Sequence, residues 1–333
     1  MWRFMVVVLL LLGPLVRVCT GQEFHGAPIS LSDQVDNGGT YAGIRLLGAL
    51  RLPRIVINGA KLCGLSGLAW DEDSELLYAL SDGGGLFHLK PEFDDRGFLR
   101  DVRLVQAHPL LDAAGNPLRE PYNDSEGLAI VNGHNGIQDD TKLLVSFDLR
   151  PRVILYDCKG RWLGEEKIPA LLKDVRNYRD INNALEAACV HSRWGVLVGT
   201  ELPLRNEPAG RVRIFAGDGR SWLYPLSDAP NSSLVAFEAL PEGGLLTLER
   251  AFVAPFLPFV ISLRRTEPLL SGMEGPLKVT DVAVFNSSQG WHLDNFEGLT
   301  HYRDRRFFMV SDDNCFHFQK TLLVHFELLP VSP

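Results

Sequence analysis

The sequence carries no excess of positive charge. Its 333 residues include 33 Lys and Arg against 41 Asp and Glu, a formal net charge of −8. A broad nucleic-acid-binding surface needs clustered basic residues, so we expect no nucleic-acid partner. Apolar residues make up 46% of the chain, which is enough for a substantial globular core.

Long apolar runs are absent after the first stretch of the chain, so we expect no transmembrane segment. In the opening stretch, "MWRFMVVVLLLLGPLV", one Arg precedes a short apolar run, as in secretory signal peptides. We therefore expect a signal peptide over residues 1–21, an N-terminal extension over 22–40, and a secreted or periplasmic mature protein. Lipid attachment at Cys19 is the alternative, but Arg17 and Val18 stand where small residues are expected.

Cysteine is scarce, with five residues in the chain. If Cys19 leaves with the signal, Cys63, Cys158, Cys189 and Cys315 remain, and their spacing matches no metal-binding motif. In an exported protein four cysteines permit one or two disulfides, and a buried thiol is the alternative for each.

Several common catalytic motifs are also missing. The chain has no G-x-S-x-G nucleophile elbow, no P-loop or dinucleotide fingerprint, and no H-E-x-x-H pair. A conventional serine hydrolase therefore has no support, and the stretches "GDGR" and "SDGGG" are better interpreted as turns.

One pattern is present five times. Each copy has a short apolar strand, a polar or Gly-containing turn, and a second apolar strand that ends at an acidic residue. Measured from Ser66 through the glutamates that open the later copies, the separations are 60, 60, 52 and 59 residues. Regular spacing of this kind indicates a repeat architecture. The copies cover residues 64–84, 124–148, 184–201, 235–250 and 295–316.

The segments between copies complete a four-stranded unit. Two further strand-like runs follow each of the first four copies, but only "TLLVHFELLP" follows the fifth. The missing strand can come from "GIRLLGALRLP", residues 43–53, which precedes the first copy without a partner. We therefore predict an all-β fold over residues 41–330, a five-bladed β-propeller closed by strands from both termini, with six blades as the alternative. A short helix is expected within 169–178.

Propeller geometry should gather acidic residues at one mouth of the central channel. The first strand of each blade lines the channel, and the second runs antiparallel to it, so the start of one and the end of the other share a face. The acids at strand starts are Glu126, Glu186, Glu238 and Glu297, with Ser66 in the first copy. The acids at strand ends are Asp82, Asp148, Glu201, Glu249 and Asp312.

Such a ring is electrostatically costly unless it is compensated, and a hard cation with oxygen ligands, Ca²⁺, is the sharpest hypothesis. Alternatively, acids at strand starts accept backbone N–H bonds and lock the repeats together. The expected metal ligands are Glu126, Glu186, Glu238, Glu297, Asp82, Asp148 and Asp312.

Basic residues on the same loops could pair with a small anionic substrate or ligand, although ordinary ion pairing is the alternative for each. Arg250 directly follows Glu249, and Lys320 follows Asp312. The expected catalytic group is Glu297, Glu249, Arg250 and Lys320. Further candidates on these loops are Arg150, Arg152 and Arg205.

The same geometry predicts a disulfide. Cys63 lies just before the first strand of the first copy, and Cys315 follows the second strand of the last. Those two blades adjoin where the ring closes, so a Cys63–Cys315 bond is expected. We expect the protein to be a monomer.

The stretch "NFEGLTHYRDRRFFMVSDDN…FQKTLLVHFEL" resembles the closing signature of the phytase-like propeller family, whose description is "esterase-like activity of phytase". The stretches "GLSGLAWD", "DSEGLAI" and "LLTLERAF" are similar to its internal motifs, and the resemblance spans about residues 41–329. It implies an exported propeller, and alkaline propeller phytases use calcium ions and a basic cluster to hydrolyse phosphate monoesters. Cys315 and His317 depart from the signature.

Three functions remain open at this stage. The first is a calcium-dependent hydrolase of phosphate or other esters at the acidic channel mouth. The second is a non-catalytic propeller that binds a ligand or partner there. The third is a sugar- or lactone-acting propeller enzyme, because a fold alone does not decide function.

Overall fold

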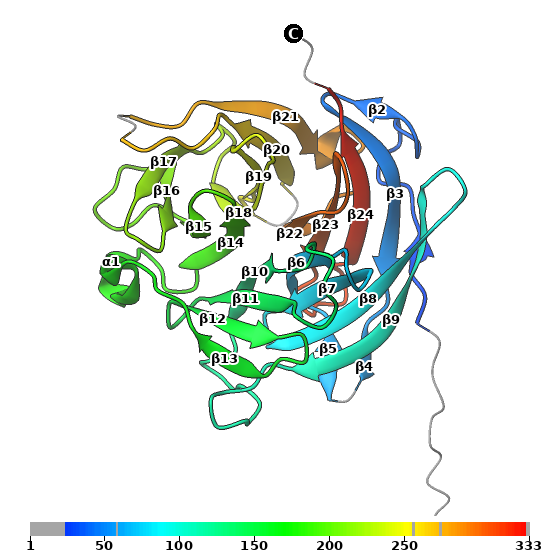
Figure 1. Cartoon of the computed structure of the whole chain (residues 1–333). Helices are drawn as coiled ribbons and strands as arrows, with labels where there is room; N and C mark the ends of the chain where they lie inside the picture. The colour runs from blue at the N-terminus through cyan, green and yellow to red at the C-terminus, as the bar shows by residue number, and fades with distance from the viewer. Residues whose placement is uncertain (1–23, 58, 255–256, 273–274, 331–333) are drawn as a thin grey trace, which may run out of the picture.

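The computed structural model describes residues 24–57, 59–254, 257–272 and 275–330. The signal peptide expected over residues 1–21 lies outside the described residues. Within them the chain forms a ring of five antiparallel sheets around a central axis (Figure 1). The predicted five-bladed β-propeller is confirmed.

Each of the first four sheets is built from four strands consecutive in the chain. The first two blades are β6 (Leu65–Asp71), β7 (Leu76–Ser81), β8 (Gly85–Phe93) and β9 (Leu99–Pro109), followed by β10 (Ser125–Val131), β11 (Lys142–Phe147), β12 (Arg152–Asp157) and β13 (Trp162–Glu165). The next two are β14 (Leu185–His191), β15 (Gly195–Thr200), β16 (Arg211–Ala216) and β17 (Ser221–Pro225), followed by β18 (Ser232–Ala239), β19 (Leu245–Ala251), β20 (Val260–Thr266) and β21 (Val279–Asn286).

Both ends of the described chain build the fifth blade, as predicted. It contains β22 (Asn295–His301), β23 (Arg306–Asp312), β24 (Thr321–Leu328) and β3 (Ile44–Leu52). Strand β24 pairs antiparallel with β3 along its whole length, and β1 (Ala27–Pro28) and β2 (Thr40–Tyr41) pair with the other edge of β3. The pairing of β24 with β3 therefore closes the ring by joining the two ends of the described chain within one sheet.

The remaining elements are short. Strands β4 (Ile55–Ile57) and β5 (Ala60–Leu62) form a separate hairpin before the first blade. Helix α1 (Ala170–Lys173) and the 3₁₀ turn η1 (Val175–Asn177) lie between β13 and β14, where a short helix was expected within 169–178. A second 3₁₀ turn, η2, spans Ser287–Gln289. No helix in the described part of the chain is long and apolar enough to cross a membrane.

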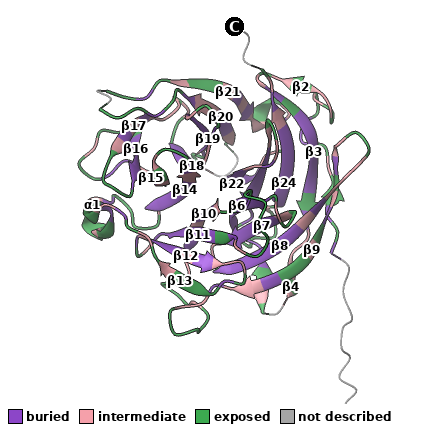
Figure 2. Cartoon of the chain, viewed as in Figure 1, coloured by how far each residue is buried: buried purple, intermediate pink, exposed green. Residues whose placement is uncertain are grey.

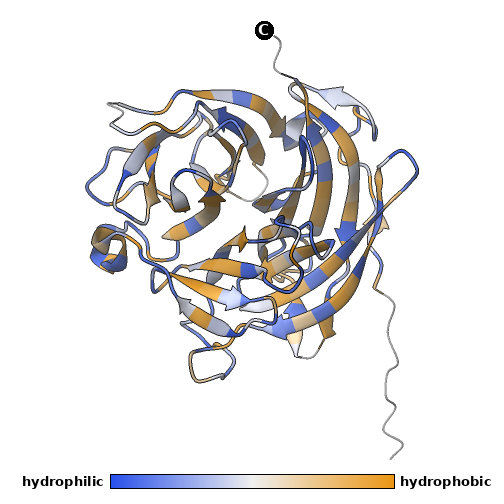
Figure 3. Ribbon diagram, viewed as in Figure 1, coloured by the Kyte–Doolittle hydropathy of each residue, from blue (hydrophilic) through white to orange (hydrophobic). Residues whose placement is uncertain are grey.

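The core consists of five apolar clusters, and each lies between two neighbouring blades. Their members alternate along the strands, because successive side chains of a strand point to opposite faces of a sheet. Figure 2 shows the buried residues along the inner strands, and Figure 3 shows that the same strands are rich in hydrophobic residues. Burial between the sheets therefore holds the innermost strands, β6, β10, β14, β18 and β22, side by side around the channel.

Candidate functional site

Two positions in each blade face the same mouth of the channel. Near its start, each innermost strand has a β-bulge, where it carries an extra residue that has no partner in the second strand of the blade. The bulge holds Ser66, Glu126, Glu186, Val235 and Glu297 in the five blades in order. The strand pairing beside the bulge also defines one equivalent position at the end of each second strand or directly after it. In the five blades in order, this position holds Asp82, Asp148, Glu201, Arg250 and Asp312.

The glycine after the bulge residue explains the repeated Glu-Gly pair. A Cβ atom at Gly67 would lie 2.7 Å from Cβ of Leu128 and 2.9 Å from the carbonyl oxygen of Glu126. A Cβ at Gly127 would lie 2.7 Å from the carbonyl oxygen of Glu186. The glycine therefore permits the close approach of the next inner strand, which leaves the glutamate side chain to face the channel.

Seven carboxylates gather at this mouth, and their mutual repulsion adds to the effect of burial. Burial raises the pKa of Asp82 to about 6, of Glu297 to about 7, of Asp148 to about 8 and of Asp312 to about 9. Burial and the neighbouring carboxylates also hold the pKa values of Glu126 and Glu186 well above their ordinary values. The seven are Asp82, Glu126, Asp148, Glu186, Glu201, Glu297 and Asp312, and Asp124 lies beside two of them.

The guanidinium of Arg250 lies among these carboxylates. Its Nη2 donates to Glu201 at 2.6 Å, and its Nη1 donates to Glu297 at 2.7 Å and to Oδ1 of Asn295 at 2.7 Å. Asn295 in turn donates to Glu297 at 2.8 Å. One side of the ring is therefore compensated by a single guanidinium shared between two carboxylates.

The other side of the ring has no such compensation. Carboxylate oxygens of Asp124, Glu126 and Asp148 lie within 4.8 Å of one another. Asp148 accepts hydrogen bonds from the backbone N–H groups of Ala184 and Leu185, at 3.0 and 2.7 Å. Glu126 has no hydrogen-bond partner, and none of the three forms an ion pair, among the described residues. Three converging carboxylates without an ion pair among the described residues could supply part of the six to eight oxygen ligands that Ca²⁺ takes.

The channel is nearly closed below the carboxylates. A cavity of about 10 Å³ remains at the level of Glu186 and Glu297. This volume holds about one water molecule or a bare ion. The apolar side chains around it include Leu68, Leu128 and Leu299. The acidic mouth is therefore a shallow site with a hydrophobic floor rather than one end of an open pore.

Glu238 is not at this mouth, so its predicted position is wrong. It lies near the end of β18, where its carboxylate accepts from the backbone N–H groups of Ala239 at 3.0 Å and His301 at 3.3 Å. These contacts join the far ends of β18 and β22 at the opposite mouth, beside a pocket of about 530 Å³ lined by Trp70 and Tyr302. Val235, three residues earlier, occupies the bulge position in this blade.

Glu249 faces the space between the third and fourth blades instead of the channel, which corrects its predicted position as well. Its carboxylate accepts from Tyr224 Oη at 2.6 Å, from the Ser227 backbone N–H at 2.8 Å, from Ser232 Oγ at 2.7 Å and from Arg264 at 2.7 Å. These bonds occupy both oxygens, so Glu249 joins two blades and has no free lone pairs directed to the channel mouth.

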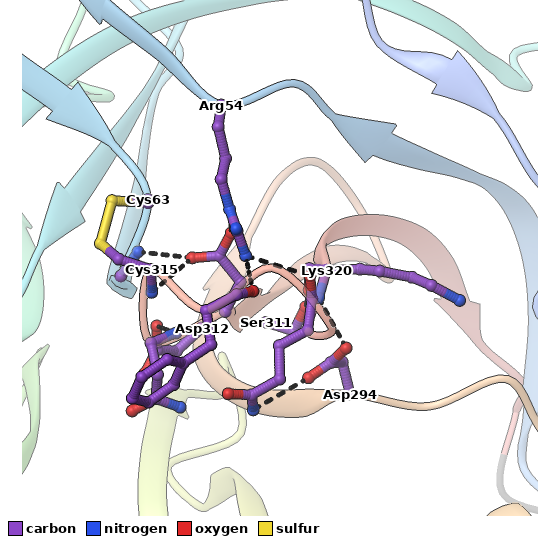
Figure 4. Close-up of polar contacts among 12 residues, drawn as sticks. Arg54, Cys63, Asp294, Ser311, Asp312, Cys315 and Lys320 are labelled. Atoms are coloured by element: carbon purple, nitrogen blue, oxygen red, sulfur yellow. Dashed lines mark hydrogen bonds and ion pairs between the residues drawn. A yellow bond between two sulfur atoms is a disulfide. The ribbon is translucent and has the colours of Figure 1, made fainter.

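Lys320 contributes its backbone to the mouth and directs its ammonium elsewhere. Its N–H donates to Asp294 at 2.7 Å, and its carbonyl oxygen accepts from Ser311 Oγ at 2.7 Å. Figure 4 shows the side chain extending away from Asp294 and Asp312. Lys320 lines a separate outer pocket with Arg51 and His317. The predicted pairing of Lys320 with a substrate at the acidic mouth therefore has no geometric basis.

The loop that carries Lys320 is fastened at several points (Figure 4). Asp313 accepts from Arg54 Nε at 2.5 Å and from the Gly64 backbone N–H at 3.0 Å. The expected disulfide between Cys63 and Cys315 is present, with a Cα–Cα distance of 5.1 Å. The other two cysteines within the described residues, Cys158 and Cys189, are free thiols. Of the two aspartates in "SDDN", only Asp312 thus belongs to the channel mouth.

Sequence reasoning missed Asp124 and Asn295. Each stands two residues before a bulge glutamate, in "DSE" and "NFE". The shared spacing was a usable signal, because the bulge brings a side chain two residues earlier to the same mouth. Burial raises the pKa of Asp124, and Glu120 adds to the rise, while Arg152 opposes it.

A comparison with protein families gives a match over most of the chain. A sequence model of the phytase-like family, described as "Esterase-like activity of phytase", matches residues 60–315. A search of curated proteins gave no significant match.

Three solved structures are similar at low identity. The Cps50 (Swd1) β-propeller domain of Myceliophteria thermophila is 10% identical, covers 92% of this chain and 99% of its own, and has a TM-score of 0.36. A PQQ-bound aldose sugar dehydrogenase from Streptomyces coelicolor is 10% identical over 84% and 97% of the two chains, with a TM-score of 0.39. A gluconolactonase from Xanthomonas campestris is 14% identical over 93% and 98%, with a TM-score of 0.38. These values are too low to carry any inference about activity.

Proposed function

Because the chain belongs to the phytase-like family, we propose that it is an exported, metal-dependent hydrolase of phosphate esters or other esters. The reaction would take place at the acidic mouth of the channel on a small anionic substrate. The observation that carries this proposal is the uncompensated group of Asp124, Glu126 and Asp148, whose oxygens converge without an ion pair among the described residues. The disulfide is compatible with an oxidising compartment outside the cytoplasm.

The residues present fit a calcium ion. Asp124, Glu126 and Asp148 would hold it, and Glu186 and Asp82 are close enough to affect the same carboxylates electrostatically. All of these donors are carboxylate oxygens, which suit a hard cation and not a soft one. When bound, the ion would supply Lewis-acid polarisation of an ester oxygen.

The chain's own residues would supply the proton transfer. Burial raises the pKa of Glu297 to about 7, so its carboxylate can accept a proton from an attacking water at neutral pH. Burial also raises the pKa of Asp312 to about 9, so this acid carries a proton at neutral pH and can donate it to a leaving oxygen. Arg250 holds Glu297 in position through a 2.7 Å hydrogen bond.

The test combines metal analysis with a substrate panel. We expect purified protein to contain calcium and to release phosphate from an aryl phosphate, with loss of both after chelation and dialysis. Carboxylic ester or lactone turnover without phosphate release would assign the substrate class differently. Absence of turnover across the panel, or turnover unaffected by chelator, would contradict a metal-dependent hydrolase.

A matched pair of variants locates the metal. We expect Glu126→Gln to abolish the rise in melting temperature caused by calcium, because it removes an unpaired ligand from the centre of the group. Glu238→Gln is the control, because Glu238 is a buried glutamate at the opposite mouth. It should keep the calcium response of the unmodified protein. An equal response in both variants would contradict the assigned site.

A further inference from the structure

A second pocket lies outside the channel, between the first and second blades. It has a volume of about 490 Å³ and is formed by strands β12 and β13 together with the segment between β9 and β10. Figure 1 shows this segment beside β13. The pocket takes no part in the function proposed above, and its lining is chemically distinct from the acidic mouth.

Three alternate residues of β12 form the inner wall of this pocket. Arg152, Ile154 and Tyr156 share one face of the strand, because side chains two residues apart point to the same side. Tyr122 and Trp162 line the pocket as well, and their side chains are 44% and 39% exposed. The pocket thus has the aromatic side chains of Tyr122 and Trp162 around its inner wall, and Arg152 places a positive charge at one end of that wall.

The guanidinium of Arg152 has no carboxylate partner among the described residues. It donates to the carbonyl oxygens of Arg150, at 2.9 Å, and Tyr122, and it lies 3.9 Å from the centre of the Phe147 ring. A guanidinium has five N–H donors, so these two bonds leave donors free. Burial lowers the pKa of Arg152, and the charge of Glu165 partly opposes this effect.

Tyr156 supplies a second donor without a partner. Its side chain is 1% exposed, yet its hydroxyl has no hydrogen bond among the described residues. The hydroxyl oxygen is not fully enclosed, so it can donate to water or to a ligand in the pocket. Burial raises the pKa of Tyr156, so the group remains a protonated donor at neutral pH.

Two acidic residues near the pocket are engaged elsewhere, whereas Asp124 lies close enough to Arg152 for the guanidinium to lower its pKa. Asp112 accepts from the backbone N–H groups of Ala114 at 2.9 Å and Asn116 at 2.8 Å in its own turn. Glu165 of β13 forms its ion pair with Lys173 at 2.9 Å. Neither forms an ion pair with Arg152, and the exposed Arg119 adds a further positive charge to the lining.

We propose that this pocket binds a small organic anion that carries a flat apolar ring, such as an aromatic carboxylate or phosphonate. The anionic group accepts hydrogen bonds from the guanidinium of Arg152 and the hydroxyl of Tyr156. The ring lies between the aromatic side chains of Tyr122 and Trp162. Binding needs no metal and does not depend on the hydrolase activity proposed above.

Phenylphosphonate is a suitable probe, because its carbon–phosphorus bond resists ester hydrolysis. Titration calorimetry in the presence of chelator would measure its binding to the whole protein, with inorganic phosphate and benzyl alcohol as comparison ligands. We expect phenylphosphonate to bind more tightly than either, because only it carries both the charge and the ring. No binding up to about 20 mM, or equal binding of inorganic phosphate, would overturn the proposal.

Two variants test the assigned donors. We expect Arg152→Gln to weaken binding of phenylphosphonate by about 10-fold or more, because it removes a charge-assisted hydrogen bond. Tyr156→Phe removes only the hydroxyl oxygen and should weaken binding by about 3- to 10-fold. Arg161→Gln is the control, since Arg161 is exposed and paired with Asp157 at 2.5 Å. Unchanged binding in both pocket variants would overturn the proposal.

Discussion

At the scale of single residues, Arg250 decides how charge is distributed around the channel mouth. It stands in the fourth blade at the position that an acidic residue occupies in the other four. It forms ion pairs with Glu201 and Glu297, whereas Asp124, Glu126 and Asp148 form none among the described residues. The same residue therefore stabilises one side of the ring and leaves the other side free to bind a cation.

Replacing Arg250 with glutamine should destabilise the metal-free protein by about 3–5 kcal/mol, because Glu201 and Glu297 would remain buried without their cation. Urea unfolding at neutral pH measures this free energy of unfolding. Arg265→Gln is the matched control, since Arg265 forms a surface ion pair with Glu242 of the β18–β19 turn and should cost about 0–1 kcal/mol. Equal effects of the two substitutions would contradict the role of Arg250.

The same residues show what the sequence could not reveal. "LERAF" offers both an acid and a base at the end of β19, and only the strand register decides which side chain faces the channel. A shift of one residue exchanges the two faces of a strand, and here the register directs Arg250 inward and Glu249 between blades. Likewise "VAFEAL" contains a glutamate, but the bulge selects Val235 and not Glu238.

At the scale of elements, alternation and spacing were enough to predict the blade hairpins and the strand shared between the two ends. The hairpin of β4 and β5 was not predicted, because three-residue strands are too short to show a periodic pattern. Residues expected as an N-terminal extension contribute β1 and the first residue of β2 to the fifth blade, where both strands pair with β3. Such pairing depends on neighbours distant in sequence, which local patterns do not contain.

The disulfide is one of the contacts that hold the "SDDN" loop beside the first blade. It joins residues 252 positions apart, so it restricts the unfolded chain over most of its length. We expect the paired substitution Cys63→Ser with Cys315→Ser to lower the free energy of unfolding by about 2–5 kcal/mol. Cys158→Ser serves as the control, because Cys158 is a free thiol. A difference below about 1 kcal/mol between the two proteins in urea unfolding would contradict this expectation.

At the scale of the whole molecule, circular closure concentrates charge that is dispersed along the chain. The acidic residues of the ring are spread along the chain from Asp82 to Asp312, yet they meet at one mouth of the channel, although the net charge of the chain is only −8. Repetition made this gathering predictable, because every blade places equivalent positions at the same radius and height. The balance of charge within the ring was not predictable, since it depends on which blades depart from the repeat.

This concentration of acids gives the metal-free protein a defined dependence on pH. Burial raises the pKa of Asp82 to about 6, of Glu297 to about 7, of Asp148 to about 8 and of Asp312 to about 9, all above the ordinary values near 4. Between about pH 4 and 9 the folded protein therefore binds more protons than the unfolded chain, so its free energy of unfolding falls as the pH rises.

Calcium should oppose this loss of stability, because it binds the ionised carboxylates and replaces the protons that leave. We expect the melting temperature in chelator to fall steadily from pH 5 to pH 9. In calcium it should change much less, so that the stabilisation by calcium is larger at pH 9 than at pH 5. A series of melting curves in the two conditions measures both slopes. A melting temperature in chelator that rises with pH over this range would mean that the ring acids are already compensated within the folded chain, which the unpaired carboxylates of the second blade argue against.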